Sequence, residues 1–392
     1  MPRRRRPWLL TTAAVLLGLV AVLVTVVMTV PIGTTATALI TLGVDGAQEV
    51  TLVLLVAGAG LALLAWRRRA RVAVPAAGVC AALMLVMTAV PAVTLWRTAS
   101  ALGVHVSLGD YLWHGLSPGS GRPKDARTLV YARVDGVALE LDYLPAHGAA
   151  RAGAGHPAVV YVHGGGWKIG SREDGYPWGR WFTDRGYAVF TIDYRLLPHA
   201  DWQTGPGDVK AAVGFVRDNA ARFGIDPSDI TLFGESAGGH LALMAAYTQG
   251  DPLFPPTNPH ADTSVRTVIN FYGTTDFDDA LAHSTAPGLI RDATRAYIGG
   301  TREQQPARWY ASSPLRHVRP GLPATLSVHG QDDRLIPPSQ AHLLDEALAR
   351  AGVPHRSVTL PWASHLFDLT RGNPATQIAG GVIERFERQN AR

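Results

Sequence analysis

The chain has 392 residues, enough for more than one domain, and 47% of them are hydrophobic. The formal net charge of +5 comes from the N-terminal segment. Up to Arg97, nine arginines stand against Asp45 and Glu49, a charge of +7 that leaves −2 for the rest. Because that remainder is slightly acidic, nucleic-acid binding is not expected of it. The single cysteine, Cys80, excludes an intrachain disulfide and a cysteine-based zinc site.

Three uncharged, apolar runs near the N-terminus predict a membrane anchor. They cover residues 8–30, 50–66 and 72–96. A helix needs about 20 apolar residues to cross a bilayer, so the middle run is at the short end of that range. We therefore expect residues 1–98 to hold three transmembrane helices in the lipid bilayer and residues 99–126 to form a linker.

Arginine clusters predict the orientation of this anchor. They lie at 3–6 and 67–71, and the loop 31–49 between the first two runs contains neither Lys nor Arg. Because loops rich in Lys and Arg stay in the cytoplasm, both clusters are expected there, and the third span leads outside. We expect a multi-pass protein of the cell membrane whose C-terminal domain is extracytoplasmic.

A cleaved signal peptide is the alternative for the first run. Ala36-Thr37-Ala38 resembles a signal-peptidase site. The run is longer than the roughly 7 to 15 residues of a signal-peptide core, which favours an uncleaved helix. Either arrangement is expected to place the C-terminal domain outside.

From residue 127 the pattern changes to short strands that alternate with helices. It opens with a hairpin around the turn Asp135-Gly136. The expected strands are 129–134, 137–144, 158–162, 188–192, 230–233, 265–271, 324–328 and 357–360, and the expected helices are 176–185, 209–223, 241–247 and 339–351. This alternation predicts an α/β domain over 127–392, with a mainly parallel sheet and helices on both faces. Residues 272–320 are too long for an ordinary connection and are expected to form a cap.

Two motifs after expected strands point to acyl-transfer chemistry. The G-E-S-A-G sequence at 234–238 lies between an apolar strand and a helix, the context of a nucleophile elbow that exposes a serine hydroxyl. The H-G-G-G-W sequence at 163–167 can turn backbone N–H groups toward an oxyanion. Either motif alone is also compatible with a simple glycine turn. Together they favour Ser236 as a nucleophile.

These motifs, with the D-Y-R-L sequence at 193–196, resemble the α/β-hydrolase superfamily, and more narrowly its hormone-sensitive-lipase-like and feruloyl-esterase-like serine esterases. The resemblance covers roughly residue 127 to the C-terminus and leaves the three spans outside. It implies an α/β-hydrolase fold preceded by three transmembrane helices. It also implies a carboxylesterase or lipase that acts on small-molecule or lipid esters and needs no cofactor.

The resemblance implies a catalytic triad with Ser236 as nucleophile. Asp333 stands at the position of the triad acid, with Asp332 as the alternative of a solvated loop carboxylate. His365, after the last strand, stands at the position of the general base, and an imidazole is suited to moving a proton near neutral pH. The family often has Gly where Trp362 stands, a departure that concerns the shape of this loop.

Backbone N–H groups of Gly164, Gly165 and Ala237 are expected to form the oxyanion hole. No metal site is expected, because the 14 histidines show no H-E-x-x-H spacing. Other polar residues near the motifs are expected to have structural roles: His163, His240 and His329 in packing, Glu235 in support of the site, and Asp208 as a helix N-cap.

Three other functions stay open. They are a serine peptidase on the same fold, an acyltransferase that passes the acyl group to another acceptor, and an anchored binding module without activity. The glycines at 164–166 argue against the peptidase, and the complete set of Ser, Asp and His argues against the binding module. The sequence predicts no oligomeric state.

Overall fold

The computed structural model describes residues 7–30, 47–114, 121–148, 155–259 and 262–390. Its chain separates into two compact units, Met1–Ser117 with Leu360–Ile378, and Pro118–Thr359 with Ala379–Arg392. The arginine cluster at 3–6, the Ala36-Thr37-Ala38 sequence and part of the expected linker lie outside the described residues.

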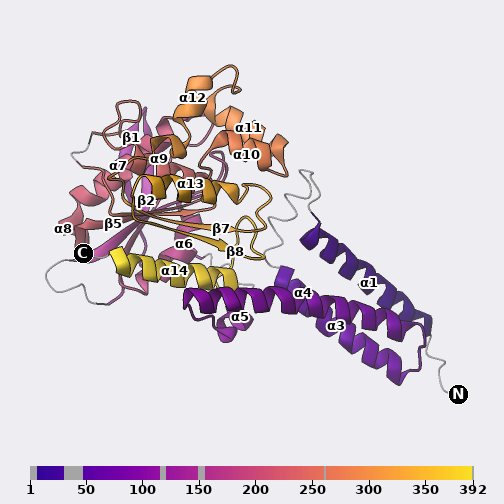
Figure 1. Ribbon diagram of the computed structural model, residues 1–392. Helices are drawn as coiled ribbons and strands as arrows, with labels where there is room; N and C mark the ends of the chain where they lie inside the picture. Colours follow the sequence, from indigo (N-terminus) through magenta and orange to yellow (C-terminus); the bar gives the residue numbers. More distant parts are fainter. Residues whose placement is uncertain (1–6, 31–46, 115–120, 149–154, 260–261, 391–392) are drawn as a thin grey trace. The chain divides into compact units, whose positions relative to one another are not determined.

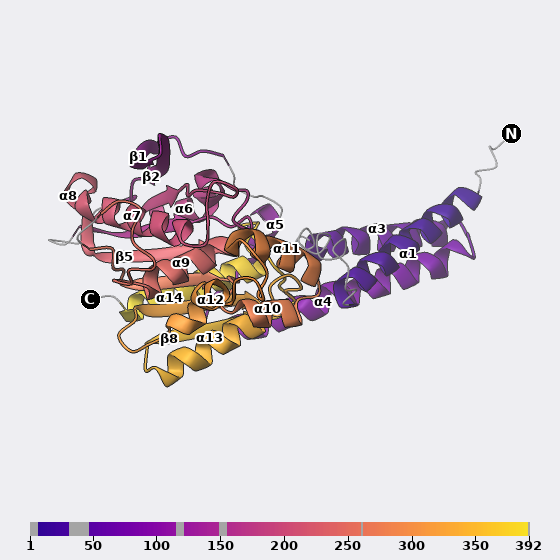
Figure 2. The same ribbon diagram turned by 90° about the horizontal axis from the view of Figure 1, so that it is seen from above.

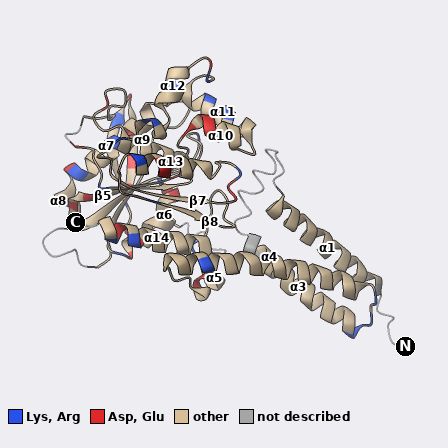
Figure 3. Ribbon diagram, in the orientation of Figure 1, with Lys and Arg blue, Asp and Glu red and all other residues tan. Residues whose placement is uncertain are grey.

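The first unit contains helices α1 (Pro7–Thr29), α3 (Ala47–Arg67), α4 (Ala73–Leu102) and α5 (Leu108–His114). Three of the described helices have stretches long and apolar enough to cross a membrane, at Trp8–Thr29, Val50–Arg67 and Ala73–Leu102. Charged residues are almost absent along them (Figure 3). Helix α4 continues past the expected end at residue 96 and stops at Gly103, whose left-handed backbone (φ 62°) caps it.

Small side chains and a hydroxyl pair lie between α3 and α4. A Cβ added to Gly58 would lie 3.2 Å from the backbone nitrogen of Ala81, so the two helices approach closely there. The hydroxyl of Thr88 donates to that of Thr51 at 2.9 Å. Because lipid is as apolar as the helices, close packing and interhelical hydrogen bonds are the interactions that hold membrane helices together.

In the second unit the described strands form one eight-stranded sheet in the order β1-β2-β4-β3-β5-β6-β7-β8. Strands β1 and β2 form the expected antiparallel hairpin, and β3, β4, β5, β6 and β7 pair in parallel. The strands are β1 (Arg127–Val134), β2 (Val137–Leu144), β3 (His156–Val162), β4 (Ala188–Ile192), β5 (Ile225–Glu235), β6 (Thr267–Phe271), β7 (Ala324–Gly330) and β8 (His355–Leu360). The expected α/β sheet is confirmed.

Helices cover both faces of this sheet. Helices α7, α9 and α13 lie over one face, and α6 and α14 over the other (Figure 1). In Figures 1 and 2, α10, α11 and α12, which belong to the expected cap region, are grouped together. The helices are α6 (Tyr176–Thr183), α7 (Thr204–Asp218), α8 (Ala220–Phe223), α9 (Ala237–Tyr247), α10 (Phe277–His283), α11 (Pro287–Ile298), α12 (Pro306–Ala311), α13 (Ser339–Arg350) and α14 (Pro374–Asn390).

The expectation that Asp208 caps a helix is wrong. Helix α7 already begins at Thr204, because the carboxylate of Asp201 accepts the backbone N–H groups of Gln203 and Thr204 at 3.0 and 2.9 Å. Asp208 therefore lies inside the helix, fully buried, where it pairs with the guanidinium of Arg195 at 2.7 Å. The residue at the N-cap is Gln203, which makes no capping hydrogen bond with its side chain.

A buried charge cluster ties α14 to strands β5 and β6. The Arg266 guanidinium contacts the carboxylate of Glu387 and lies 2.6 Å from that of Asp229. Glu387 also accepts the hydroxyls of Thr267 and Thr231 at 2.9 and 3.1 Å. Because Arg266 and Glu387 are 7% and 2% exposed, neither charge has access to bulk water, and each depends on the other.

Arg266→Met should therefore lower the free energy of unfolding by about 3–5 kcal/mol, because it leaves the Glu387 carboxylate buried without its cation. Denaturant unfolding of the full chain measures this loss. The matched control is Arg388→Met, which removes an exposed pair with Glu384 and should cost about 0.5 kcal/mol or less. Equal losses in the two variants would contradict the role given to Arg266.

Candidate active site

Strand register brings the carboxyl ends of four strands to one edge of the sheet. Val162 of β3 pairs with Gly234 of β5. Gly234 pairs with Asn270 of β6, which in turn pairs with Ser327 of β7. Because these strands are parallel, the segments that follow them leave the sheet at its carboxyl edge, where ligand sites of such sheets form.

Ser236 occupies a strained turn between β5 and α9. Its φ of 52° and ψ of −119° are rare for a residue with a side chain. The Ser236 N–H donates to the carbonyl of Phe271 at 2.9 Å, which holds the turn against β6. A side chain at Gly238 would clash with the carbonyls of Val162 and His163, so only glycine fits there. This is the geometry of a nucleophile elbow.

The glycine loop runs beside this serine. A Cβ added to Gly164 would lie 3.3 Å from the Cβ of Ser236, and one added to Gly165 (φ 107°) would clash with the carbonyl of Ile169. Ala237 is the first residue of α9, where helix N–H groups have no partner within the helix. The structure thus brings Ser236, Gly164, Gly165 and Ala237 together.

Tyr194 supports the glycine loop through hydrogen bonds and ring stacking. Its hydroxyl donates to the carbonyls of His163 and Gly164 at 3.0 and 3.3 Å, and its ring stacks on that of His163 with centroids 4.3 Å apart. Burial raises the pKa of Tyr194 well above its usual range, so this hydroxyl stays a donor. The packing role expected of His163 is consistent with this stack.

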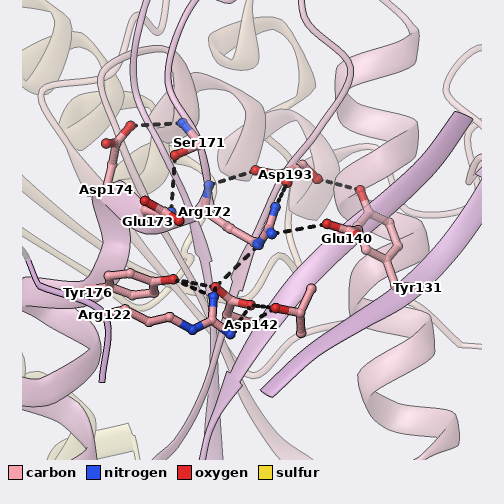
Figure 4. Close-up of polar contacts among 11 residues, drawn as sticks. Arg122, Tyr131, Glu140, Asp142, Ser171, Arg172, Glu173, Asp174, Tyr176 and Asp193 are labelled. Atoms are coloured by element: carbon pink, nitrogen blue, oxygen red, sulfur yellow. Dashed lines mark hydrogen bonds and ion pairs between the residues drawn. The ribbon is translucent and has the colours of Figure 1, made fainter. Parts of the chain in front are cut away.

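Arg172, which follows the glycine loop, is fixed by three carboxylates (Figure 4). Its backbone N–H donates to Asp193 at 2.7 Å, and its guanidinium also contacts that carboxylate. The guanidinium lies 3.1 Å from Glu140 and 3.3 Å from Asp142. Strand β2 and the segment after β4 thereby hold the end of the loop in place.

Asp142 is the buried centre of this network. Burial raises the pKa of its carboxyl, but hydrogen bonds from Thr128 and Tyr176 and the charges of Arg172 and Arg122 outweigh burial, and the net pKa is lowered. Asp142 is therefore ionised at neutral pH and belongs to the scaffold of the loop.

Sequence reasoning missed the residues that support the loop. The D-Y-R-L sequence pointed only to a family resemblance. In the structure its Asp193 binds Arg172 and its Tyr194 binds the glycine turn. Asn270 was also missed: its side-chain oxygen accepts the N–H of Gly273 at 3.1 Å, and its side-chain nitrogen donates to Ser327 at 3.1 Å. Except for Gly273, their partners are distant in sequence, so no local pattern marks the residues that support the loop.

Asp333 follows β7 and is buried, whereas Asp332 is exposed. One carboxylate oxygen of Asp333 accepts the backbone N–H groups of Leu335 and Ile336, both at 2.9 Å. The other oxygen lies 3.2 Å from Nε2 of His329. These contacts fix the orientation of the Asp333 carboxylate, which favours Asp333 over Asp332 as a functional group.

His365 lies between β8 and α14 and is 3% exposed. It belongs to the segment Leu360–Ile378, which groups with the first unit, whereas Ser236 and Asp333 belong to the second unit. The sequence had placed all three residues in one C-terminal domain. Of the expected triad, only Ser236 and Asp333 therefore share a unit.

His240, four residues after Ser236, lies in an aromatic cluster. Its ring centroid is 5.3 Å from those of Trp167, Phe277 and Tyr297. Trp167 of the glycine loop also stacks on Tyr297, with centroids 4.5 Å apart. Helices α10 and α11 thus pack on both the glycine loop and the nucleophile helix.

The sheet and the turn at Ser236 have the arrangement of a known fold. A mainly parallel sheet whose strand-to-helix turn carries a strained serine defines the α/β-hydrolase fold. The model of the BD-FAE family matches residues 143–348, just over half of the chain, and the chain belongs to this family.

Solved structures and curated relatives agree with that assignment. The chain is 33% identical over 233 residues to Esterase LipQ of Mycobacterium tuberculosis, or 58% of this chain and 54% of that one. It spans about half the length of the curated relatives it matches. Esterase 2 of Thermogutta terrifontis, phosphoramylated by tabun, has a TM-score of 0.59 at 27% identity, over 69% of this chain and 97% of its own. Its propionate-bound form has a TM-score of 0.58 at 28% identity, over 68% and 95%. The expected fold and the resemblance to esterases are confirmed.

The buried His240 should make folding stability depend on pH. Burial lowers the pKa of His240 to about 4, against about 6.5 in an unfolded chain. Between these values the unfolded chain binds one more proton, so stability rises as pH rises through this window, by about 3 kcal/mol in all.

Denaturant unfolding of wild type and His240→Gln between pH 4 and 7 measures this effect. The glutamine can still donate to the Ser312 carbonyl, which accepts from Nε2 of His240 at 2.8 Å, but it does not titrate. In the variant, the slope of the unfolding free energy against pH should correspond to about one bound proton fewer than in wild type. An unchanged slope would show that His240 does not carry the dependence.

Proposed function

We propose that this chain is a membrane-anchored serine esterase that hydrolyses small-molecule or lipid carboxylic esters through an acyl-enzyme on Ser236. One observation carries the proposal: Ser236 sits in a strained elbow directly beside the glycine loop. Membership of the BD-FAE family and the names of the esterase relatives support it.

In the proposed reaction the Ser236 hydroxyl attacks the ester carbonyl carbon while His365 takes its proton. The N–H groups of Gly164, Gly165 and Ala237 stabilise the negative charge that develops on the carbonyl oxygen. His365 then returns the proton to the departing alcohol, which leaves an acyl group on Ser236. His365 next removes a proton from water, which attacks the acyl-enzyme carbonyl carbon; the bond to the Ser236 oxygen then breaks, the acid leaves, and His365 returns the proton to Ser236.

Asp333 is the proposed partner of the imidazole. A carboxylate in this role keeps the correct ring nitrogen protonated and stabilises the imidazolium that forms. The two backbone donors from Leu335 and Ile336 support the assignment, because they fix one carboxylate oxygen and set the direction of the other. No step of this mechanism requires a cofactor or a metal.

We also propose that α1, α3 and α4 cross the cell membrane and that the catalytic domain is extracytoplasmic. Their length and apolar composition support the spans. The arginines at 3–6 and 67–71, set against a loop without Lys or Arg, support the orientation.

Substitution of the triad tests the reaction. Ser236→Ala should abolish both ester turnover and labelling by a fluorophosphonate, because the attacking oxygen is gone. Asp333→Asn should lower kcat by about 10⁴-fold, the loss typical of a triad carboxylate, while Asp332→Asn, at the exposed neighbour, should cost little. Persistent labelling of the alanine variant would overturn the nucleophile, and a reversed order of the two asparagine variants would overturn the acid.

Reporter fusions after residue 392 test the orientation. Alkaline phosphatase, which folds only outside the cytoplasm, should be active there, and a fluorescent protein that matures only in the cytoplasm should be dark. The physical reason is that the opposite orientation would translocate both arginine clusters. The reverse pair of signals would mean that one of the three helices does not cross, the shortest run at 50–66 being the first candidate.

A further inference from the structure

The loop that carries His365 is built onto the N-terminal helices. The segment Leu360–Ile378 groups with residues Met1–Ser117 in one compact unit. The general base proposed above is therefore the one triad member whose loop packs with the membrane helices. One contact joins the loop to α1 and α4, and two join it to Ser107 and His114 at the two ends of α5; they lie on both sides of His365 in the sequence.

The first contact is the side chain of Trp362. It packs against an apolar cluster whose buried members are Ala21, Cys80, Met84 and Met87, from α1 and α4. Its backbone has φ 59°, a left-handed conformation that glycine adopts easily and a bulky residue resists. A tryptophan at such a position persists only where other interactions hold it, and the cluster supplies them.

The second and third contacts lie after His365. The side-chain oxygen of Gln377 accepts the N–H of Ser107 at 2.6 Å, and its nitrogen donates to the Ser107 carbonyl at 3.1 Å. Ser107 directly precedes α5. The N–H of Gly372 donates to the carbonyl of His114, the last residue of α5, at 3.2 Å.

Hydrogen bonds within the segment also join its parts to one another. The hydroxyl of Thr376 donates to the carbonyls of Phe367 and Thr370 at 3.1 and 2.9 Å. Gln377 donates to the carbonyl of Gly372 at 2.8 Å. Contacts at residues 362, 372 and 377, together with hydrogen bonds inside the segment, thus hold the His365 loop to the N-terminal unit.

We propose that Trp362 and Gln377 are positioning residues, which fasten the His365 loop to the N-terminal helices and so make the membrane anchor part of the catalytic apparatus. This inference rests on the proposed function, since it gives His365 the role of general base. Its consequence is that loosening either contact lowers kcat without changing substrate binding. A displacement of about 1 Å in a catalytic group can cost about 10²-fold in rate.

The Trp362→Gly variant distinguishes a role of Trp362 in fastening the loop from a purely local role in the turn. If Trp362 is only a turn residue, Trp362→Gly relieves the left-handed backbone and leaves kcat unchanged. If Trp362 fastens the loop, the same variant loses the packing and kcat falls. Trp362→Phe keeps an aromatic ring for the cluster and should retain most of the activity.

The experiment uses the full chain in a mild non-ionic detergent. It measures kcat and KM on p-nitrophenyl butyrate, the rate of fluorophosphonate labelling, and the melting temperature. Trp362→Gly and Gln377→Ala should each lower kcat and the labelling rate roughly 10- to 100-fold with KM unchanged. Asp135→Gly is the matched control, because it also removes a left-handed non-glycine residue (φ 50°), in the exposed β1–β2 turn, and should leave kcat unchanged.

Two results would overturn the inference. One is full kcat in Trp362→Gly and Gln377→Ala with an unchanged or higher melting temperature. The other is an equal loss of activity in Trp362→Phe and Trp362→Gly. If Trp362→Gly does not fold, Gln377→Ala decides alone. His365→Ala is assayed in parallel: activity in that variant would overturn the proposed function, whereas an inactive His365→Ala beside a fully active Trp362→Gly would overturn the inference alone.

Discussion

The strained backbone of Ser236 is held by contacts with the strands on either side of β5. A residue with a side chain keeps φ near 52° only when its surroundings allow no other conformation. Here the N–H of Ser236 is held by β6, and Gly238 lies so close to the end of β3 that no side chain fits between them. The position of the hydroxyl is therefore set by the register of three parallel strands.

The glycine loop needs a different kind of support, because glycines have no side chains with which to hold themselves. Tyr194 supplies a hydroxyl to its carbonyls, and Arg172 ties its far end to carboxylates on β2 and after β4. These charges are partly or fully buried, so each is stable only with its partners in place. The glycine loop thus rests on a layer of ionic contacts and on the hydroxyl of Tyr194.

His365 lies in a segment that packs with the N-terminal helices, so these helices can do more than tether the domain. A simple tether could be replaced by any hydrophobic segment without effect on the reaction. Helices α1 and α4 instead pack against Trp362, and Ser107, in the segment between α4 and α5, hydrogen-bonds to Gln377, so the N-terminal unit is joined to the loop of the proposed base.

Local sequence patterns were sufficient to predict the strands and helices of the α/β domain and the position of its serine turn. Apolar runs of strand length that alternate with helical patterns were enough for the parallel sheet, and the glycines around Ser236 and after β3 were enough for the elbow and its neighbouring loop, because these are local patterns. The contacts that hold these elements in place became visible only in the folded chain. The salt bridge that puts Asp208 inside α7, the carboxylates around Arg172 and the contacts of Trp362 and Gln377 join residues far apart in the chain. No period or spacing records such pairs, because they form only once the strands and helices have packed.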